Sequence, residues 1–340
     1  MNFGKNLLYL MFICIGTTSC IITDDARSTQ IEIMKPGLFN FPENIKTVAL
    51  INTVSNNNDN SFRYDDGQRI ERDTTITYRD LSNTCIDALA WALKKEGYFS
   101  KVINYRDSLT NISLLNVGPF YPKRLFQKTK SDLCIFLNDF DFNIAVLNGS
   151  DYVVENIVSL SWTIIYKMDT LAYTYKQRDT LTFTAIDFPS GLADNMKIRM
   201  VANNSSTFLG RTFCSKIIPT WIPVDRFYYT SNNRDMLQAE KYAKNNNWLQ
   251  AAALWNKQTK NKNLRIAAKA SYNMALACEM EGNPDAAIDW LIRSHAILKK
   301  NNETHKMNCQ HYINTLVLRK KEIEKLGQQV RKNDIKIKSE

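Results

Sequence analysis

The sequence is poor in glycine and histidine, with 11 glycines and 3 histidines among 340 residues. It has none of the glycine-rich patterns GxSxG, GxGxxG and GxxxxGK[ST], which build nucleophile elbows and phosphate cradles. None of the histidines lies in an HExxH motif. These shortages argue against common hydrolase, nucleotide-binding and zinc-protease designs. We therefore predict a protein that is not an enzyme, with no catalytic residues, no metal, no cofactor and no small-molecule substrate.

Proline is also scarce, at 8 residues, while 44% of the residues are hydrophobic and 11% are aromatic. Fibrous, collagen-like and wholly disordered chains lack this apolar content, which is needed to offset the entropy of an ordered chain. The composition is therefore globular, and the length suggests about two domains.

No long hydrophobic run is present at the N-terminus, where a bilayer-spanning helix would need about 20 apolar residues. The run at 7–15 has nine residues, follows Lys5 and precedes small residues and Cys20. This order predicts a signal peptide over 1–19. It resembles the bacterial lipoprotein signal, with Thr17 where leucine is commonest, and the resemblance implies lipidation of Cys20. A plainly cleaved secretory peptide and an uncleaved anchor are the alternatives.

Asp24 and Asp25 follow Cys20 closely. Acidic residues at this place resemble the surface-export signal of Bacteroides-like lipoproteins, and an ordinary solvated tether is the alternative. We therefore expect an outer-membrane lipoprotein that is exposed on the cell surface or faces the periplasm, with a tether over 20–44.

Positive charge is concentrated in the C-terminal third, since residues 231–340 hold 20 of the 44 Lys and Arg residues but 11 of the 34 acidic residues. Such an excess favours anionic partners. An exported protein seldom meets nucleic acid, so we expect headgroups, lipopolysaccharide or an acidic protein instead. A basic face that only keeps the protein soluble is the plain alternative.

Five cysteines follow Cys20, and their wide spacing inside apolar patterns does not form a framework of small-protein disulfides. Most are expected to be buried as small apolar side chains, and one bridged pair is left open. They are Cys85, Cys134, Cys214, Cys278 and Cys309.

An α+β domain is predicted over 45–230, with a mixed sheet packed by helices. The apolar runs at 47–51 and 133–137 read as buried strands, separated by a polar loop at 55–75 and a helix that starts near Asp80. Strict alternation at 158–167 and two further short strands up to residue 185, separated by a turn near Gln177 to Asp179, predict a meander of three strands. A helix over 192–214 and an extended connector after Pro219 complete the domain.

The segments TVALI, ALAWALKKEGYFSKVINY and SDLCIFLNDF resemble in pattern the N-terminal assembly domains of TolB and CsgG-like envelope proteins. This resemblance covers about 100 residues. It implies an interaction domain without catalysis.

Helical repeats are predicted over 231–300. The segments 245–258 and 281–294 align with a period of 36 residues, so that Ala251 matches Ala287 and Asn246 matches Gly282. Each segment reads as the second helix of a hairpin entered through a short turn. The pattern resembles the tetratricopeptide repeat, and together with the signal and the α+β domain it resembles a family of tetratricopeptide-repeat lipoproteins from Bacteroides-like bacteria. That family has no known activity.

The last segment, 301–340, reads as a basic capping helix followed by a tail, or as a coiled-coil arm for a partner. Stacked hairpins form a groove that takes peptides or helices, and aromatic and basic residues of the repeats are the candidates for lining it. The candidate partner-binding residues are Tyr242, Trp248, Trp255, Tyr272, Trp290, Lys241, Lys244, Arg265 and Lys269.

Two weaker candidate sites remain. His305 and Cys309 are four residues apart on one predicted helix face, and Asp139 and Asp141 alternate along a strand. Zinc sites need three or four ligands, and paired carboxylates are more often a solvated strand end.

The sequence therefore predicts an envelope lipoprotein that acts as a protein-interaction scaffold through its repeats, with an envelope protein or peptide as its partner. The alternative is a surface glycan-binding or nutrient-acquisition accessory lipoprotein.

Overall fold

The computed structural model describes residues 25–54, 61–65, 70–105, 121–148, 152–167, 172–298 and 302–329. The predicted signal peptide and Cys20 lie outside the described residues. The chain divides into two compact units. The helical unit comprises Met1–Lys35 and Trp221–Gly327, and the sheet unit comprises Pro36–Thr220 and Gln328–Glu340.

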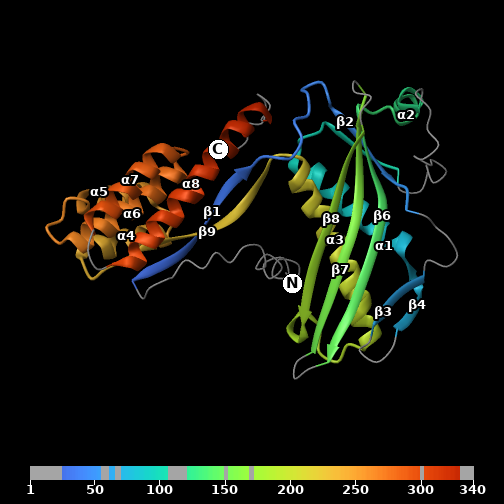
Figure 1. The fold of residues 1–340 in the computed structure, drawn as a ribbon, viewed down its shortest axis with the longest axis horizontal. Coiled ribbons are helices and arrows are strands. Elements are labelled where there is room, and N and C mark those ends of the chain that lie inside the picture. The colour runs from blue at the N-terminus through green and yellow to red at the C-terminus, as the bar shows by residue number, and fades with distance from the viewer. Residues whose placement is uncertain are drawn as a thin grey trace. The chain divides into compact units, whose positions relative to one another are not determined.

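The sheet unit holds a seven-stranded mixed sheet (Figure 1). The strand order is β4-β3-β6-β2-β5, and β7 pairs with β6 and β8. Strand β2 is parallel to β5 and β6, whereas β6, β7 and β8 form the antiparallel meander that the sequence predicts. The strands are β2 (Thr47–Asn52), β3 (Ser61–Asp65), β4 (Ile70–Thr77), β5 (Lys101–Asn104), β6 (Leu133–Asn148), β7 (Tyr152–Tyr166) and β8 (Ala172–Thr184).

Two long helices, α1 (Tyr78–Glu96) and α3 (Asp194–Ile217), pack on one face of this sheet (Figure 1). A capping box between Thr77 and Asp80 starts α1, and Gly97 ends it with a φ of 69°. The short helix α2 (Tyr121–Thr129) contributes to a second, smaller apolar cluster with β2 and β6. The large core thus lies between the sheet and the α1–α3 pair.

Even-numbered residues of β7 face this core. Trp162 is fully buried, and its ring stacks on Phe213 of α3 with ring centroids 4.1 Å apart. The alternation read from the sequence is a strand, as predicted, but it is half-buried only up to Ser159, because residues 160–165 are buried on both faces. All five cysteines after Cys20 are free, and only Cys278 is not fully buried, which confirms their prediction as small apolar side chains.

Two local predictions for the sheet unit were wrong. The expected polar loop at 55–75 includes β3 and the start of β4, which pair with each other. The two short strands expected up to residue 185 are one strand, β8. Gln177 and Asp179, read as turn residues, stay in register opposite Leu160 and Val158 and hydrogen bond to each other at 2.5 Å. Pairing with a long neighbour overrides their turn propensity.

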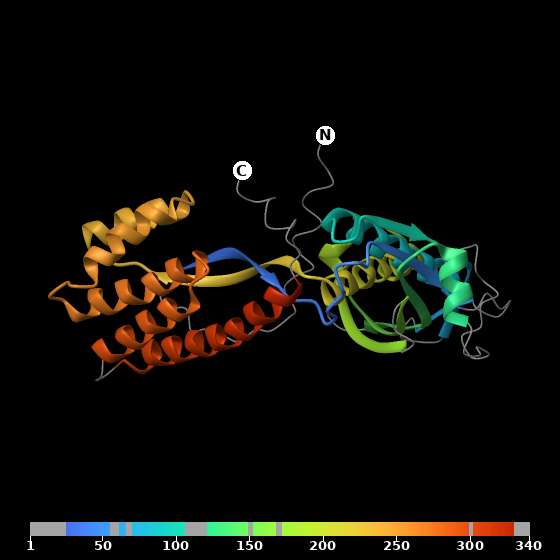
Figure 2. The ribbon, with the colours of Figure 1, turned by 90° about the horizontal axis from the view of Figure 1, so that it is seen from above.

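The helical unit is a stack of helix pairs followed by a longer helix, in agreement with the predicted repeats (Figure 2). Asn246 and Gly282, matched by the 36-residue period, both have positive φ, at 58° and 73°. Left-handed backbone at equivalent places confirms that the two hairpins turn in the same way. The helices are α4 (Arg234–Lys244), α5 (Trp248–Gln258), α6 (Leu264–Met280), α7 (Pro284–Ile297) and α8 (Glu303–Gln329).

The expected tether over 20–44 was wrong for residues 26–35, which form β1 (Ala26–Lys35). This strand pairs with β9 (Thr220–Tyr229), the segment predicted as an extended connector, in a separate two-stranded sheet. We call this sheet the β1–β9 ribbon. Ile31 and Ile33 are buried in the helical unit, so the burial of alternate apolar residues orders a segment that looks like a polar leader.

Candidate interaction site

The β1–β9 ribbon is packed between two sets of helices within the helical unit. On one side Ile31, Ile33 and Tyr228 join a cluster with side chains of α4, α5 and α6. On the other side Phe227 and Tyr229 join a cluster with side chains of α6, α7 and α8. The ribbon therefore fills the space between the stacked helices, where the sequence analysis expected a peptide-binding groove.

Three predicted groove residues contact the ribbon. Tyr272 stacks on Phe227, with ring centroids 4.9 Å apart and planes at 22°. Trp248 and Trp255 lie 6.2 and 5.7 Å from the ring of Tyr228. Trp255 is completely buried and Tyr272 is 2% exposed, whereas Trp248 is half-buried. These aromatic residues bind a segment of their own chain.

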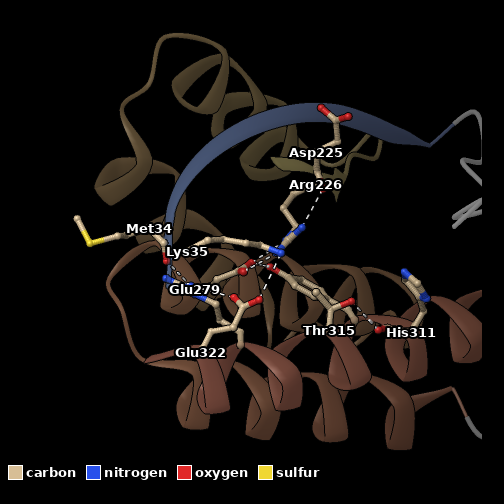
Figure 3. A network of polar contacts seen from close by, with 10 residues as sticks. Met34, Lys35, Asp225, Arg226, Glu279, His311, Thr315 and Glu322 are labelled. Atoms are coloured by element: carbon tan, nitrogen blue, oxygen red, sulfur yellow. Dashed lines mark hydrogen bonds and ion pairs between the residues drawn. The ribbon is translucent and has the colours of Figure 1, made fainter. Parts of the chain in front are cut away.

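A buried ion pair fastens β9 to the helices (Figure 3). Arg226 donates to both carboxylate oxygens of Glu279 on α6, at 2.8 and 2.7 Å, and Tyr312 on α8 donates to the same carboxylate at 2.5 Å. Burial and the charge of Glu279 raise the pKa of Tyr312, so its hydroxyl stays protonated. Burial alone would lower the pKa of Arg226, but the hydrogen bonds and charge of Glu279 raise it. The three side chains bind one another, and these contacts hold β9 against α6 and α8.

The end of β1 is fastened to α8 by a second set of contacts (Figure 3). Arg319 donates to the backbone carbonyl of Met34 at 2.6 Å, and Lys35 pairs with Glu322 at 3.3 Å. A two-stranded sheet has exposed edges, and side chains that bond to the edge backbone close it to other strands. Side chains of the helices thus bind both strands of the ribbon.

His305 and Cys309 do share a helix face, and the structure adds Ser294 of α7 to them. The Nε2 atom of His305 lies 2.9 Å from Ser294 Oγ and 3.5 Å from Cys309 Sγ. All three residues are buried, and Ser294 donates to the carbonyl of Ala268 at 2.7 Å. Burial lowers the pKa of His305 to about 4 and raises that of Cys309 to about 12. At neutral pH this is an uncharged cluster closed to solvent.

Asp139 and Asp141 also face the same way, as the sequence indicates. They are exposed on β6 opposite Ser161 and Ser159 of β7, and Phe140 between them is buried. Within the part of the chain that the structure describes, no three His, Cys, Asp or Glu residues are grouped so that they could hold a metal ion.

The remaining predicted site residues lie on the surface or at its edge. Trp290 is half-buried beneath Arg293, whose guanidinium is 5.0 Å from the ring, and Tyr242 is half-buried against the α4–α5 cluster. Lys241 and Arg265 are exposed.

The structure brings two of the predicted lysines to the start of β1. Lys244 pairs with Glu240 at 2.7 Å, and Lys269 pairs with Asp25 at 2.6 Å. Arg27 pairs with the same Glu240 at 3.2 Å. Sequence reasoning missed Asp25, Arg27 and Glu240 because it placed the first two in a tether. The alternation of Ile31 and Ile33 with polar residues was the available signal.

Two family models match the chain. One, described as a domain of unknown function (DUF8603), matches residues 45–229, which is more than half of the chain. The other, also described as a domain of unknown function (DUF6340), matches residues 237–317 in the helical unit. No curated protein matches the chain.

Two solved structures, of a minor lipoprotein and of PelC, show a distant similarity. A minor lipoprotein from Acinetobacter baumannii is 10% identical, with 53% of this chain and 98% of that chain covered and a TM-score of 0.27. PelC from Paraburkholderia phytofirmans, described as a dodecamer, is 11% identical, with 56% and 98% covered and a TM-score of 0.24. At these scores the similarity carries no argument about site or assembly. None of the helices in the described ranges is both long and apolar enough to cross a bilayer.

Proposed function

The chain belongs to the family of the domain of unknown function DUF8603, and we propose that it is a non-enzymatic lipoprotein of the outer membrane that acts as a protein-interaction scaffold. In this proposal Cys20 carries the lipid, and the folded chain faces the periplasm or the cell surface. The partner is an envelope protein or a peptide, bound by the helical unit.

The observation that carries the proposal is the outer surface of the helix stack. Since the β1–β9 ribbon fills the space between the helices, a partner must bind elsewhere on the unit. Three successive helices present exposed leucines, with Leu237 43%, Leu249 77% and Leu264 59% exposed. Covering a leucine side chain contributes about 1.5–3 kcal/mol. These exposed side chains favour association with a partner.

The non-enzymatic part of the proposal is supported by the state of the reactive groups. The Ser294–His305–Cys309 cluster is buried and uncharged at neutral pH, so it offers neither a thiolate nor an accessible base. Asp139 and Asp141 are exposed to solvent on the sheet.

The test is a crosslinked pull-down of the lipidated full chain from envelope fractions, with Cys20→Ala as the localisation control. We expect specific envelope proteins with the native chain and at least a ten-fold smaller yield with Leu249→Asp. The matched control is Ile186→Asp in the sheet unit, where the native side chain is 82% exposed. Equal yields from both variants, or no specific protein from the native chain, would refute the scaffold function.

The second candidate is a surface glycan-binding or nutrient-acquisition accessory, and Trp91 on α1 favours it. This indole is 50% exposed and is flanked by Lys95 and Arg211, whose charged groups lie 5.3 and 4.7 Å from its ring centre. Because both charged groups lie over the ring, a sugar would contact the exposed part of the indole together with these hydrogen-bond donors. Binding of purified chain to soluble polysaccharides should then fall at least ten-fold with Trp91→Ala, and unchanged binding would remove this candidate.

A further inference from the structure

The start of β1 lies close in sequence to the proposed lipid site. Six Cα steps join Cys20 to Ala26, so the lipidated residue lies within about 20 Å of the strand in any chain conformation. The expected tether of 25 residues would have allowed a far greater distance. The ordered strand therefore holds one end of the helical unit near the membrane that takes up the lipid.

That end of the ribbon is fixed to the helices by direct contacts. The amide of Thr230 donates to the carbonyl of Asp25 at 2.7 Å, and Lys269 donates to its carboxylate at 2.6 Å. Lys269 also donates to the carbonyl of Thr230 at 3.3 Å. Since Lys269 is on α6, the first half of this helix lies beside the start of β1.

Positive charge exceeds negative charge around this point. The basic residues of the anchor-side patch are Arg27, Lys244, Lys262, Arg265 and Lys269. Arg265 is one helical turn before Lys269 on the same face of α6, and Lys262 is exposed just ahead of this helix. Glu240 neutralises one of its two basic neighbours, and Asp25 neutralises Lys269. The formal sum is +3, or +2 when Asp24 is counted.

We propose that the anchor-side patch rests on anionic lipid headgroups of the membrane that holds Cys20. The inference depends on the proposed lipoprotein function, because the lipid is what brings the patch to the bilayer. Lysine and arginine side chains attract anionic headgroups within a screening length of about 8 Å at physiological salt. A linkage of at most about 20 Å lets the patch reach that layer. The contact sets which side of the helical unit faces the bilayer.

The test uses the mature full chain with Cys20→Ala, which removes the lipid, in sedimentation with vesicles. One set contains phosphatidylcholine alone, and the other contains about 30% phosphatidylglycerol. We expect binding to the anionic vesicles only, and its loss as salt is raised. Each charge unit removed should weaken binding about five-fold, so Arg265→Glu should weaken it about 25-fold.

The matched control is Lys321→Glu, an equal charge change at an exposed position of α8. Its neighbour Lys320 pairs with Asp285, which follows the far end of α6, and this helix is about 25 Å long. Lys321→Glu should therefore bind like the parent chain. Circular dichroism on both variants establishes that they fold.

Equal binding to the two vesicle types, or equal weakening by Arg265→Glu and Lys321→Glu, would overturn the inference. Failure of the lipoprotein function is seen separately, as the absence of fatty-acid label on the native chain in cells. That result leaves the vesicle measurement of the patch unaffected.

Discussion

The side chain of Asn273 on α6 binds both backbone groups of Tyr229 on β9. Its amide nitrogen donates to the Tyr229 carbonyl at 2.7 Å, and its amide oxygen accepts from the Tyr229 nitrogen at 2.7 Å. The amide thus takes the place of a neighbouring strand. Because Asn273 is fully buried, water does not compete for these bonds.

Replacing Asn273 with alanine should lower the free energy of unfolding by about 2–3 kcal/mol, since two buried backbone groups lose their partners. Urea denaturation followed by circular dichroism measures the change. Asn256→Ala, at an exposed position on α5, is the control and should stay within about 0.5 kcal/mol of the native chain. Equal effects of the two substitutions would contradict the role given to Asn273.

Because the Arg226–Glu279 pair is buried, a single variant and a double variant of the pair should differ in stability. Arg226→Met leaves the buried Glu279 carboxylate without its cation and should cost about 3–5 kcal/mol. The double variant Arg226→Met with Glu279→Leu removes both charges and should recover part of this loss, because the buried Tyr312 hydroxyl then lacks its acceptor. Breaking the exposed Lys320–Asp285 pair by Lys320→Ala should leave the melting temperature unchanged. A double variant less stable than the single one would refute this account.

His305 makes stability depend on pH. Burial, together with smaller effects of the charges of His295 and Lys269, lowers its pKa from an ordinary 6.5 to about 4. Between about pH 6.5 and pH 4, the His305 imidazole therefore binds a proton in the unfolded chain but not in the folded chain. The free energy of unfolding should fall as the pH drops from about 6.5 to about 4, by about 3 kcal/mol from this residue.

Chemical denaturation at a series of pH values measures this dependence. His305→Asn should flatten the curve in that interval, whereas His311→Asn, on a more exposed face of α8, should keep the native slope. A native slope in the His305 variant would rule out this residue as the source.

Two helical glycines should respond oppositely to alanine. A Cβ atom on Gly210 of α3 would lie 2.1 Å from the carbonyl oxygen of Cys85, so Gly210→Ala must separate α1 from α3 and should cost more than about 2 kcal/mol. A Cβ atom on Gly327 of α8 would meet nothing within 4 Å, and Gly327→Ala should stabilise by about 0.5–1 kcal/mol. Thermal denaturation compares the two, and a stabilising Gly210→Ala would contradict the close helix contact.

Local patterns predicted much of the fold. The alternation along 158–167 identified β7, and the 36-residue period placed Asn246 and Gly282 at equivalent left-handed turns. These features depend on the chemistry of neighbouring residues. They could therefore be read from the sequence without knowing which segments meet.

The candidate site was less predictable. Trp255 and Tyr272 have the residue type and spacing of groove residues, yet the structure buries both against β9. Large aromatic residues at helical spacing occur both in binding grooves and in buried cores. The sequence pattern is the same in the two cases. Only the position of the ribbon distinguishes the two.

The sequence by itself determined the apolar N-terminal run with Cys20 after it, the helix and strand periods, and the excess of positive charge at the C-terminal end. Tertiary structure alone decided that Ala26–Lys35 pairs with Thr220–Tyr229, nearly 200 residues away, and that this ribbon fills the helix stack. The physical reason is that short strands gain their stability from burial and pairing with a distant partner. Their own residues do not reveal which partner that is.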